Sequence, residues 1–359
     1  MRKITSISDL AMRWSERLQD KTLEPLVLAL DIGGTKVAYA LFKVAPNGDI
    51  AETVVWSGKL DTQKGKPAFI SAFQTVLFEA LAFCETQPFR VLPVISAGSP
   101  GRFIGEDNRI VAKHSAANLS TFEGEFDNID LAAEVKASLP EFCEVVIKND
   151  AVAQMAAGVG FLLRDSVQRS LLLGQKIGYI GPGTGLGGGF GQIDDNGHLT
   201  VYTDGHIYDI GMTMEDGSIE RIEDIFSGRA FEAFTGKTAK EVNENPALFE
   251  MHEPLIRKFG IWMADLMMKI YFGRIEKTSA DAAWPEADCK LVAGTSCFLI
   301  GGSIGTTGKM GQLIRETAMA RMSEAGFNDI RLFIIPDAPQ AALIGAAQFI
   351  NSKVLLNWL

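Results

Sequence analysis

The sequence predicts an α/β fold made of two domains. The chain has 359 residues, which is long for one hydrophobic core, and its 47% hydrophobic and 22% charged residues are typical of a globular protein. The two halves also share a pattern, in which an apolar strand and a glycine-rich hairpin come first and strands then alternate with helices. Two such domains facing one another would place the glycine loops at the cleft between them.

Apolar runs that stop at turn residues predict the strands of the first half, and the helical spacing of apolar residues predicts its helices. A helix with a polar face over residues 1–24 precedes the first buried strand. Pro46-Asn47-Gly48-Asp49 is a hairpin signal between the second and third strands. The predicted strands are 26–30, 36–44, 50–57, 91–96 and 144–148, and the predicted helices are 68–83, 129–139 and 151–163.

The pattern begins again at the strand 144–148 and the helix 151–163, and a further predicted strand, 176–180, runs into a second glycine loop, Gly181–Gly189. The strand after this loop reaches Asp194, where Asp195-Asn196-Gly197 is the hairpin signal. Helices dominate from Ser218 to Ile275. The closing α/β stretch has predicted strands at 297–300 and 332–335 and predicted helices at 311–325 and 339–350.

Charge, cysteine content and hydropathy exclude several classes of protein. The 34 basic and 44 acidic residues give a net charge of -10, which disfavours nucleic-acid binding. The four cysteines lack CxxC spacing, and we expect ordinary reduced core thiols. The N-terminus has no apolar signal core, and Gly, Ser and Thr interrupt the longest uncharged stretch, 291–308. A cytoplasmic protein without a membrane span is expected.

The first glycine loop has the composition of a phosphate-binding turn. Asp31 ends the first strand, and Gly33, Gly34, Thr35 and Lys36 follow it. Glycines allow a sharp turn whose N–H groups approach an anion, Thr35 and Lys36 add a hydroxyl and a positive charge, and Asp31 could hold Mg²⁺ through water. The alternative is a plain β-hairpin, which requires only the glycines.

Two further glycine turns lie in the second half. Gly183–Gly188 matches GxGxxG, but a dinucleotide fingerprint requires a helix after it, and the residues from Phe190 onward predict a strand. We therefore reject a Rossmann interpretation. A third turn is predicted at Gly301-Gly302-Ser303.

Asn149-Asp150 stands at the carboxyl end of a predicted strand, just before a helix. A carboxylate in this position can reach a bound hydroxyl and accept its proton during phosphoryl transfer. The alternative is that the pair only caps the helix that begins at Ala151.

Five motifs, in this order, resemble those of the actin-like ATPase superfamily, and more closely its bacterial glucokinase and ROK sugar-kinase branches. They cover about residues 26–350, and they are DIGGTK (31–36), SPG (99–101), NDA (149–151), GPGTGLG (181–187) and GGS (301–303). The resemblance implies a ribonuclease-H-like two-domain fold with a cleft. It assigns 1–24 to an N-terminal extension, 25–147 to a small domain joined by the C-terminal helix 339–359, and 148–338 to a large domain.

The resemblance also implies an ATP-dependent hexose kinase that acts on a primary hydroxyl, at C6 of the sugar. Asp150 would be the catalytic base. The implied sugar-binding residues are Gly101, Asn118, Asn149, Asp150, Asp204, His206 and Glu223, and the implied ATP-binding residues are Asp31, Gly33, Gly34, Thr35, Lys36, Gly183, Thr184, Gly185, Gly302 and Ser303.

One departure from the family pattern affects the sugar site. The family carries Glu-x-Gly-His, whereas this chain has Thr203-Asp204-Gly205-His206, with Asp204 the nearest acid. The family's zinc site also requires a cluster of three cysteines, and no cysteine occurs between Cys143 and Cys289, so no zinc site is expected.

Two rival functions remain open at this point. One is a non-catalytic sugar sensor, and the other is an actin-like ATPase that needs no sugar. The residues before Leu26 are too few for the winged-helix domain of the family's repressors. The identity of the sugar, polyphosphate as an alternative donor and the oligomeric state stay open, although homodimers are common in the family.

Overall fold

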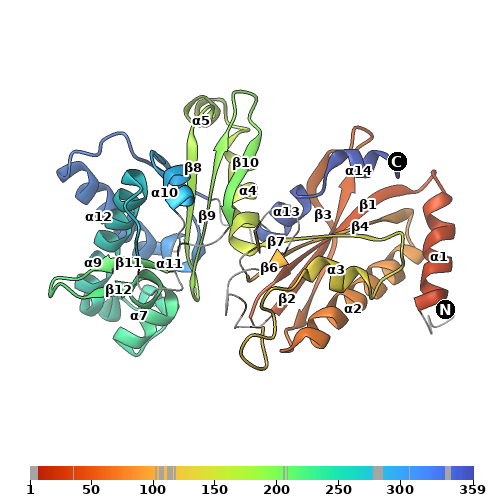
Figure 1. Ribbon diagram of the computed structural model, residues 1–359, viewed down its shortest axis with the longest axis horizontal. Helices are drawn as coiled ribbons and strands as arrows, with labels where there is room; N and C mark the ends of the chain where they lie inside the picture. Colours follow the sequence, from red (N-terminus) through yellow and green to blue (C-terminus); the bar gives the residue numbers. More distant parts are fainter. Residues whose placement is uncertain are drawn as a thin grey trace. The chain divides into compact units, whose positions relative to one another are not determined.

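The computed structural model describes residues 7–34, 36–101, 103–104, 109–110, 116, 119–204, 207, 209–277, 286–306, 308–335 and 341–359. The chain forms two compact units (Figure 1). Unit 1 comprises Met1–Ala157 and Gln340–Leu359, and unit 2 comprises Gly158–Pro339. The division falls inside the helix α4 (Asp150–Leu162). The large domain predicted from the sequence begins earlier, at residue 148. A continuous helix offers no turn or composition change that would mark this division in the sequence.

Unit 1 is built on a five-stranded mixed sheet with the strand order β3-β2-β1-β4-β7. Neighbours in the series β1-β2-β3 pair antiparallel, whereas β1, β4 and β7 run parallel. β1 and β4 are buried along most of their length because they lie inside the sheet, which explains their continuous apolar runs. All five predicted strands are confirmed, as β1 (Glu24–Ile32), β2 (Lys36–Val44), β3 (Ile50–Asp61), β4 (Phe89–Ser99) and β7 (Glu144–Asn149). A separate two-stranded sheet pairs β5 (Phe103–Ile104) with β6 (Arg109–Ile110).

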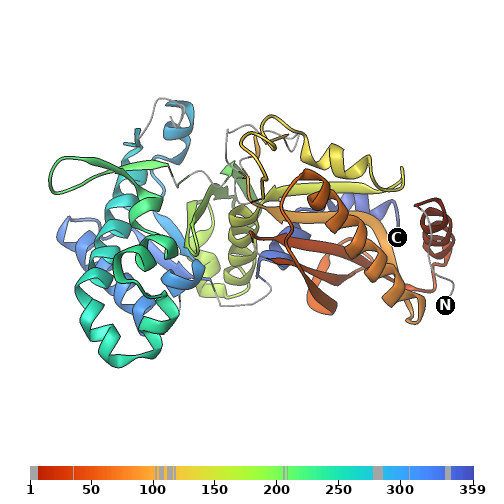
Figure 2. The same cartoon turned by 90° about the horizontal axis from the view of Figure 1, so that it is seen from below.

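Two predicted helices, α2 (Lys66–Glu85) and α3 (Leu131–Lys136), lie side by side on one face of this sheet (Figure 2). By length and composition alone, α2 could cross a membrane. Its buried residues nevertheless recur at helical spacing, and they are Phe69, Phe73, Val76, Leu77, Ala80, Leu81 and Cys84. One face of α2 therefore packs into the core of unit 1, as in an ordinary core helix.

Both ends of the described chain pack onto unit 1. The helix α1 (Ile7–Gln19) buries Leu10, Trp14 and Leu18, and Trp14 Nε1–H donates to the Val91 carbonyl over 2.7 Å. The predicted N-terminal extension is thus packed against unit 1. Near the other end, α13 (Ala341–Gln348) contacts β1 and β4, where Ser96 Oγ–H donates to the Ala346 carbonyl over 2.6 Å. The short helix α14 (Ser352–Leu356) follows.

Unit 2 repeats the sheet of unit 1, with the strand order β10-β9-β8-β14-β15. β8, β9 and β10 pair antiparallel in series, and β8, β14 and β15 run parallel. The predicted strands are confirmed as β8 (Lys176–Pro182), β9 (Leu186–Ile193), β14 (Cys297–Ile300) and β15 (Arg331–Ile334). β10 (Leu199–Asp204) follows the predicted hairpin turn at 195–197. Because β9 begins at Leu186, inside the GxGxxG stretch, a strand stands where a dinucleotide fingerprint requires a helix, which confirms that this interpretation is rejected.

The rest of unit 2 is mostly helical and surrounds an aromatic cluster. Phe259 of the long helix α9 meets Phe226, Phe231 and Trp262 at centroid distances of 5.4–5.5 Å. The helices are α5 (Ser166–Leu172), α6 (Ile222–Ile225), α7 (Gly228–Thr235), α8 (Ala239–Glu244), α9 (Pro246–Phe272), α10 (Glu286–Val292), α11 (Gly302–Thr306) and α12 (Gly308–Glu324). A small sheet joins β11 (Ile210–Thr213) to β12 (Ile219–Arg221) and β13 (Glu276–Lys277), so the helical stretch predicted from Ser218 begins only at Ile222.

Each unit therefore carries a glycine turn in the same topological place. The turn Gly33–Lys36 joins β1 to β2, and the turn Gly183–Gly185 joins β8 to β9. Both turns lie at the carboxyl ends of the parallel strands, the edge at which open α/β sheets bind their ligands.

Candidate functional site

The carboxyl ends of β1, β4 and β7 bring Asp31 and Asp150 together in unit 1. Asp31 is the register partner of Gly98, and the next residue of β4, Ser99, is the partner of Asn149. Asp150 follows Asn149 as the first residue of α4, and its Cα lies 3.4 Å from the position that a Cβ would take at Gly98. Adjacent strands therefore place the two aspartates at one edge of the sheet.

Burial raises the pKa of both carboxyl groups. Burial, together with the negative charge of Asp150, raises the pKa of Asp31 to about 7. Burial also raises the pKa of Asp150, against the backbone hydrogen bonds that lower it. Two close carboxylates in a partly desolvated site attract a proton or a cation. Such perturbed groups mark candidate sites for acid–base chemistry.

Asn149 has a structural role in this arrangement. Its Oδ1 accepts hydrogen bonds from the Ala151 and Val152 N–H groups at 2.9 and 3.3 Å, which caps α4. Its Nδ2–H donates to the Gly101 carbonyl over 2.8 Å and ties the Ser-Pro-Gly loop to the end of β7. The capping alternative is thus correct for Asn149, and sugar binding by Asn149 or Gly101 stays a prediction. Asp150 Oδ1 accepts from the N–H of Ala151 at 2.8 Å.

The first glycine turn is held by a hydrogen bond within its own backbone and by Thr62, the residue that follows β3. Gly33 N–H donates to the Lys36 carbonyl over 2.8 Å, and Thr62 Oγ1–H donates to the Gly33 carbonyl over 2.7 Å. Gly34 and Lys36 are exposed, which leaves the Lys36 ammonium accessible to an anion. Thr35 lies outside the described residues.

In unit 2, the start of α7 fixes the second glycine turn. Gly228 N–H donates to the Gly183 carbonyl over 2.7 Å, and Arg229 N–H donates to the Thr184 carbonyl over 3.1 Å. Gly183 N–H donates to the Gly185 carbonyl over 2.9 Å, and this hydrogen bond closes the turn. Within the described ranges, no residue accepts a hydrogen bond from the N–H groups of Thr184 and Gly185. Two unpaired N–H groups in a rigid turn are suited to bind an anion.

The third predicted turn packs against the second. Gly302 has φ +67°, and a Cβ there would lie 2.5 Å from the Pro182 carbonyl oxygen, so only glycine fits this approach. Gly302 also begins α11, so the predicted turn is the start of a short helix.

A cavity of about 240 Å³ lies beside these two turns. Its apolar lining comes from α8, α11 and α12, and its polar lining includes one arginine and one lysine. The lining residues are Gly183, Thr184, Gly228, Arg229, Glu232, Thr238, Ala239, Lys240, Ser303, Ile304 and Met310. The structure therefore brings the predicted residues Gly183, Thr184 and Ser303 to one pocket. It adds Arg229 and Lys240, which the sequence analysis missed because no local motif marks them.

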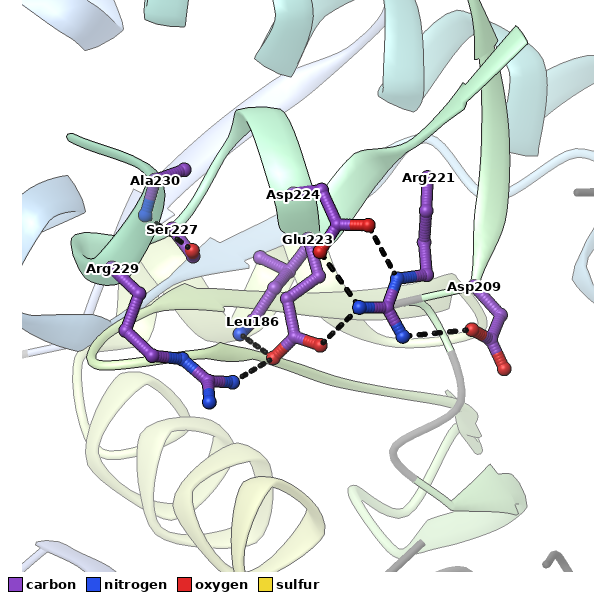
Figure 3. A network of polar contacts seen from close by, with 8 residues as sticks. All are labelled: Leu186, Asp209, Arg221, Glu223, Asp224, Ser227, Arg229 and Ala230. Carbon is purple, nitrogen blue, oxygen red and sulfur yellow. Dashed lines mark hydrogen bonds and ion pairs between the residues drawn. The ribbon is translucent and has the colours of Figure 1, made fainter. Parts of the chain in front are cut away.

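Glu223 lies in a network of charged groups next to the second turn (Figure 3). Its Oε1 accepts from the Leu186 N–H at 3.2 Å and from Arg229 Nη2 at 3.1 Å. A Cβ on Gly185 would overlap this oxygen, so the glycine is required for the contact. Glu223 thus stabilises the turn, and its contact with a sugar stays a prediction.

Arg221 forms the other part of the network. It donates to both carboxylate oxygens of Asp224, at 2.7 and 2.9 Å, and it lies 3.7 Å from Asp209 and 4.0 Å from Glu223 Oε2. Burial raises the pKa of Asp209. Arg221 therefore balances part of the negative charge around Glu223.

Several predicted sugar-site residues are not described. Asn118 and His206 lie outside the described residues, and Asp204 is described only as the last residue of β10. In the part of the chain that the structure describes, no three His, Cys, Asp or Glu side chains gather closely enough to hold a metal ion.

Comparison with known proteins finds likeness in structure only. No protein-family model and no curated protein matches the sequence. A ROK family glucokinase from Streptomyces griseus, solved with glucose and AMPPNP, is 19% identical, with 90% of this chain and 98% of that chain covered and a TM-score of 0.56. The ROK hexokinase of Thermus thermophilus is 18% identical, with coverage of 92% and 99% and a TM-score of 0.59.

A ROK family transcriptional regulator, a homologue of the E. coli MLC protein, is also similar. It is 15% identical, with coverage of 94% of this chain and 80% of that chain and a TM-score of 0.65. The chain therefore has the two-domain, actin-like fold of the ROK sugar kinases, which confirms the predicted fold. The same fold carries both kinases and a regulator.

Proposed function

We propose that the chain is an ATP-dependent hexose kinase of the ROK type, with Asp150 as the base that activates the sugar hydroxyl. The observation that carries this proposal is the placement of Asp150 beside Asp31 at the carboxyl ends of β7 and β1. The pocket beside the Gly183–Gly185 turn gives further support, because it combines a partly apolar lining with N–H groups that have no acceptor among the residues that the structure describes. The similar glucokinase of S. griseus was solved with glucose and the ATP analogue AMPPNP.

Each unit supplies one part of this chemistry. In unit 1, the Asp150 carboxylate accepts the proton of a primary sugar hydroxyl while the hydroxyl oxygen attacks the γ-phosphorus of ATP. The bond between the γ-phosphorus and the bridging oxygen of the β-phosphate breaks, and ADP leaves. The raised pKa of Asp150 makes it a stronger base than an ordinary aspartate. In unit 2, the N–H groups of Thr184 and Gly185 bind phosphate oxygens, and the partly apolar lining of the pocket, which includes the half-buried Ala239, accepts the base and ribose.

The residues of unit 1 also fit Mg²⁺. Asp31 supplies a hard carboxylate oxygen, the kind of ligand that Mg²⁺ prefers. Burial and then the charge of Asp150 raise the pKa of Asp31, and a bound cation would favour its ionised form. Bound near Asp31, directly or through water, Mg²⁺ would neutralise charge on the donor phosphates.

A sugar-binding regulator is the second candidate. Thr203 stands where the family's kinases carry a sugar-binding glutamate, and the similar structures include a transcriptional regulator. Such a protein would keep the fold and bind a sugar without transferring a phosphoryl group to it.

The test is ADP release from Mg²⁺-ATP with glucose, mannose, fructose, N-acetylmannosamine, N-acetylglucosamine, allose and glucosamine. We expect release that depends on one or a few of these sugars and falls by about 10²-fold or more in Asp150→Asn. Asp130→Asn is the matched control, because Asp130 is also an aspartate at a helix start in unit 1, where it accepts from Ala133 N–H at 2.9 Å. Release that ignores every sugar and persists in Asp150→Asn would contradict the proposed mechanism.

A further inference from the structure

We propose that Arg229 contacts the phosphates of the bound nucleotide, with its guanidinium held beside the glycine turn by Glu223. The proposal rests on the proposed function, because it takes the pocket of unit 2 as the nucleotide site. It assigns a role to a residue that lies in none of the five motifs of the sequence.

The guanidinium of Arg229 lies beside the second glycine turn. Arg229 Nη2 lies 3.1 Å from Glu223 Oε1 and 3.5 Å from the place that a Cβ would occupy on Gly185 (Figure 3). The positive charge therefore stands directly beside the turn whose Thr184 and Gly185 N–H groups have no acceptor in the described ranges. Arg229 also lines the 240 Å³ cavity together with Gly183 and Thr184.

The side chain of Arg229 is not needed to hold the turn. The backbone N–H groups of Gly228 and Arg229 already donate to the carbonyls of Gly183 and Thr184. Glu223 accepts a hydrogen bond from the N–H of Leu186. A guanidinium has five N–H donors, and in the described part of the chain only Nη2 has an acceptor. The remaining donors are available to a ligand.

The exposure of the two side chains leaves most of the Arg229 guanidinium open to a ligand. The Arg229 side chain is 56% exposed, whereas the carboxylate that holds it, on Glu223, is only 15% exposed. The guanidinium is thus anchored at one nitrogen and open to solvent at the others. Leu186 N–H also donates to Glu223 Oε1, and Arg221 lies 4.0 Å from Glu223 Oε2, so Glu223 keeps polar partners when a phosphate competes for Arg229.

The chemistry of this arrangement favours a nucleotide with two or three phosphates over a nucleotide with one. A planar guanidinium binds two phosphate oxygens at once, and its attraction grows with the charge of the ligand. A role that only stabilised the turn would instead affect all nucleotides alike. The two roles can therefore be separated by the number of phosphates on the ligand.

The experiment is calorimetric binding of AMP, ADP and ATP, with Mg²⁺ where the nucleotide requires it, to the full chain and to Arg229→Gln. Glutamine keeps a donor for Glu223 but lacks the charge. We expect Arg229→Gln to weaken ATP binding by about 10- to 100-fold, ADP binding by less, and AMP binding by less than about twofold. Arg257→Gln is the matched control, because Arg257 is 52% exposed in unit 2 and also pairs with a glutamate, Glu253, at 2.7 Å.

Each alternative outcome overturns the proposal in a distinguishable way. An equal loss for all three nucleotides would assign Arg229 a structural role, and no loss would remove it from the site, while the proposed kinase would stand in both cases. If the unmodified chain bound none of the nucleotides, the nucleotide site itself would be wrong, and the role of Arg229 would be overturned together with the proposed function.

Discussion

Replacing Asp31 with Asn is expected to stabilise the protein above neutral pH and to have little effect near pH 4. Burial and the charge of Asp150 raise the pKa of Asp31 from 3.8 to about 7. Between these values the folded chain still holds the proton that the unfolded chain has released, so this carboxyl makes stability fall as the pH rises. Below about pH 4 the group is protonated in both states, and the uncharged amide differs little from it.

The size of the effect follows from the same pKa. A rise from 3.8 to about 7 corresponds to about 4 kcal/mol at a pH above both values. Water and small rearrangements around the pair reduce this penalty in a real protein. We therefore expect Asp31→Asn to raise the free energy of unfolding by about 1–3 kcal/mol at about pH 8.

The assay is urea unfolding, followed by circular dichroism, at about pH 8 and about pH 4 in the presence of EDTA. Asp61→Asn is the control, because Asp61 is an exposed carboxylate at the end of β3 in the same sheet. A loss of stability in Asp31→Asn at pH 8, or the same change at both pH values, would refute the inference that burial and the charge of Asp150 disfavour the ionised form of Asp31.

Two further substitutions test the supports of the site. Asn149→Ala removes the cap of α4 and the donor to Gly101, and it should lower the free energy of unfolding by about 2–4 kcal/mol in urea titrations. Asn149→Asp keeps the cap and should recover part of this loss, whereas a loss below about 0.5 kcal/mol in the alanine variant would show that these bonds matter little. Gly302→Ala must adopt φ +67° and approach the Pro182 carbonyl, so it should lower the melting temperature and weaken ATP binding. An unchanged melting temperature would mean that the two turns are not packed as described.

The sequence was sufficient to predict the two sheets, because their inner strands are buried and read as apolar runs. β1, β4 and β8 are examples, and the hairpin signals that follow the first and second glycine loops also place β3 and β10 correctly. The glycine turns could be located for a related reason. At Gly302, for example, the positive φ is a property of the local backbone, so part of its signal lies in a few neighbouring positions.

Features that depend on contacts between distant segments could not be predicted. The pocket of unit 2 draws Thr184, Arg229, Lys240 and Met310 from four different elements, and nothing in the local sequence marks Arg229 or Lys240. The partners of Glu223 are similar, because its contacts with the Leu186 N–H and with Arg229 exist only once α6 packs beside the turn. The division between the units escaped prediction because it falls within α4.

Direct detection of the reaction product tests the central claim most sharply. Each sugar of the panel would be incubated with the unmodified chain and Mg²⁺-ATP, and the products would be analysed by mass spectrometry. The proposed function requires that one of the sugars gain a single phosphoryl group in step with ADP formation, and that Asp150→Asn abolish this product. Binding of a sugar and of ATP without any phosphorylated sugar would contradict the kinase and favour the regulator.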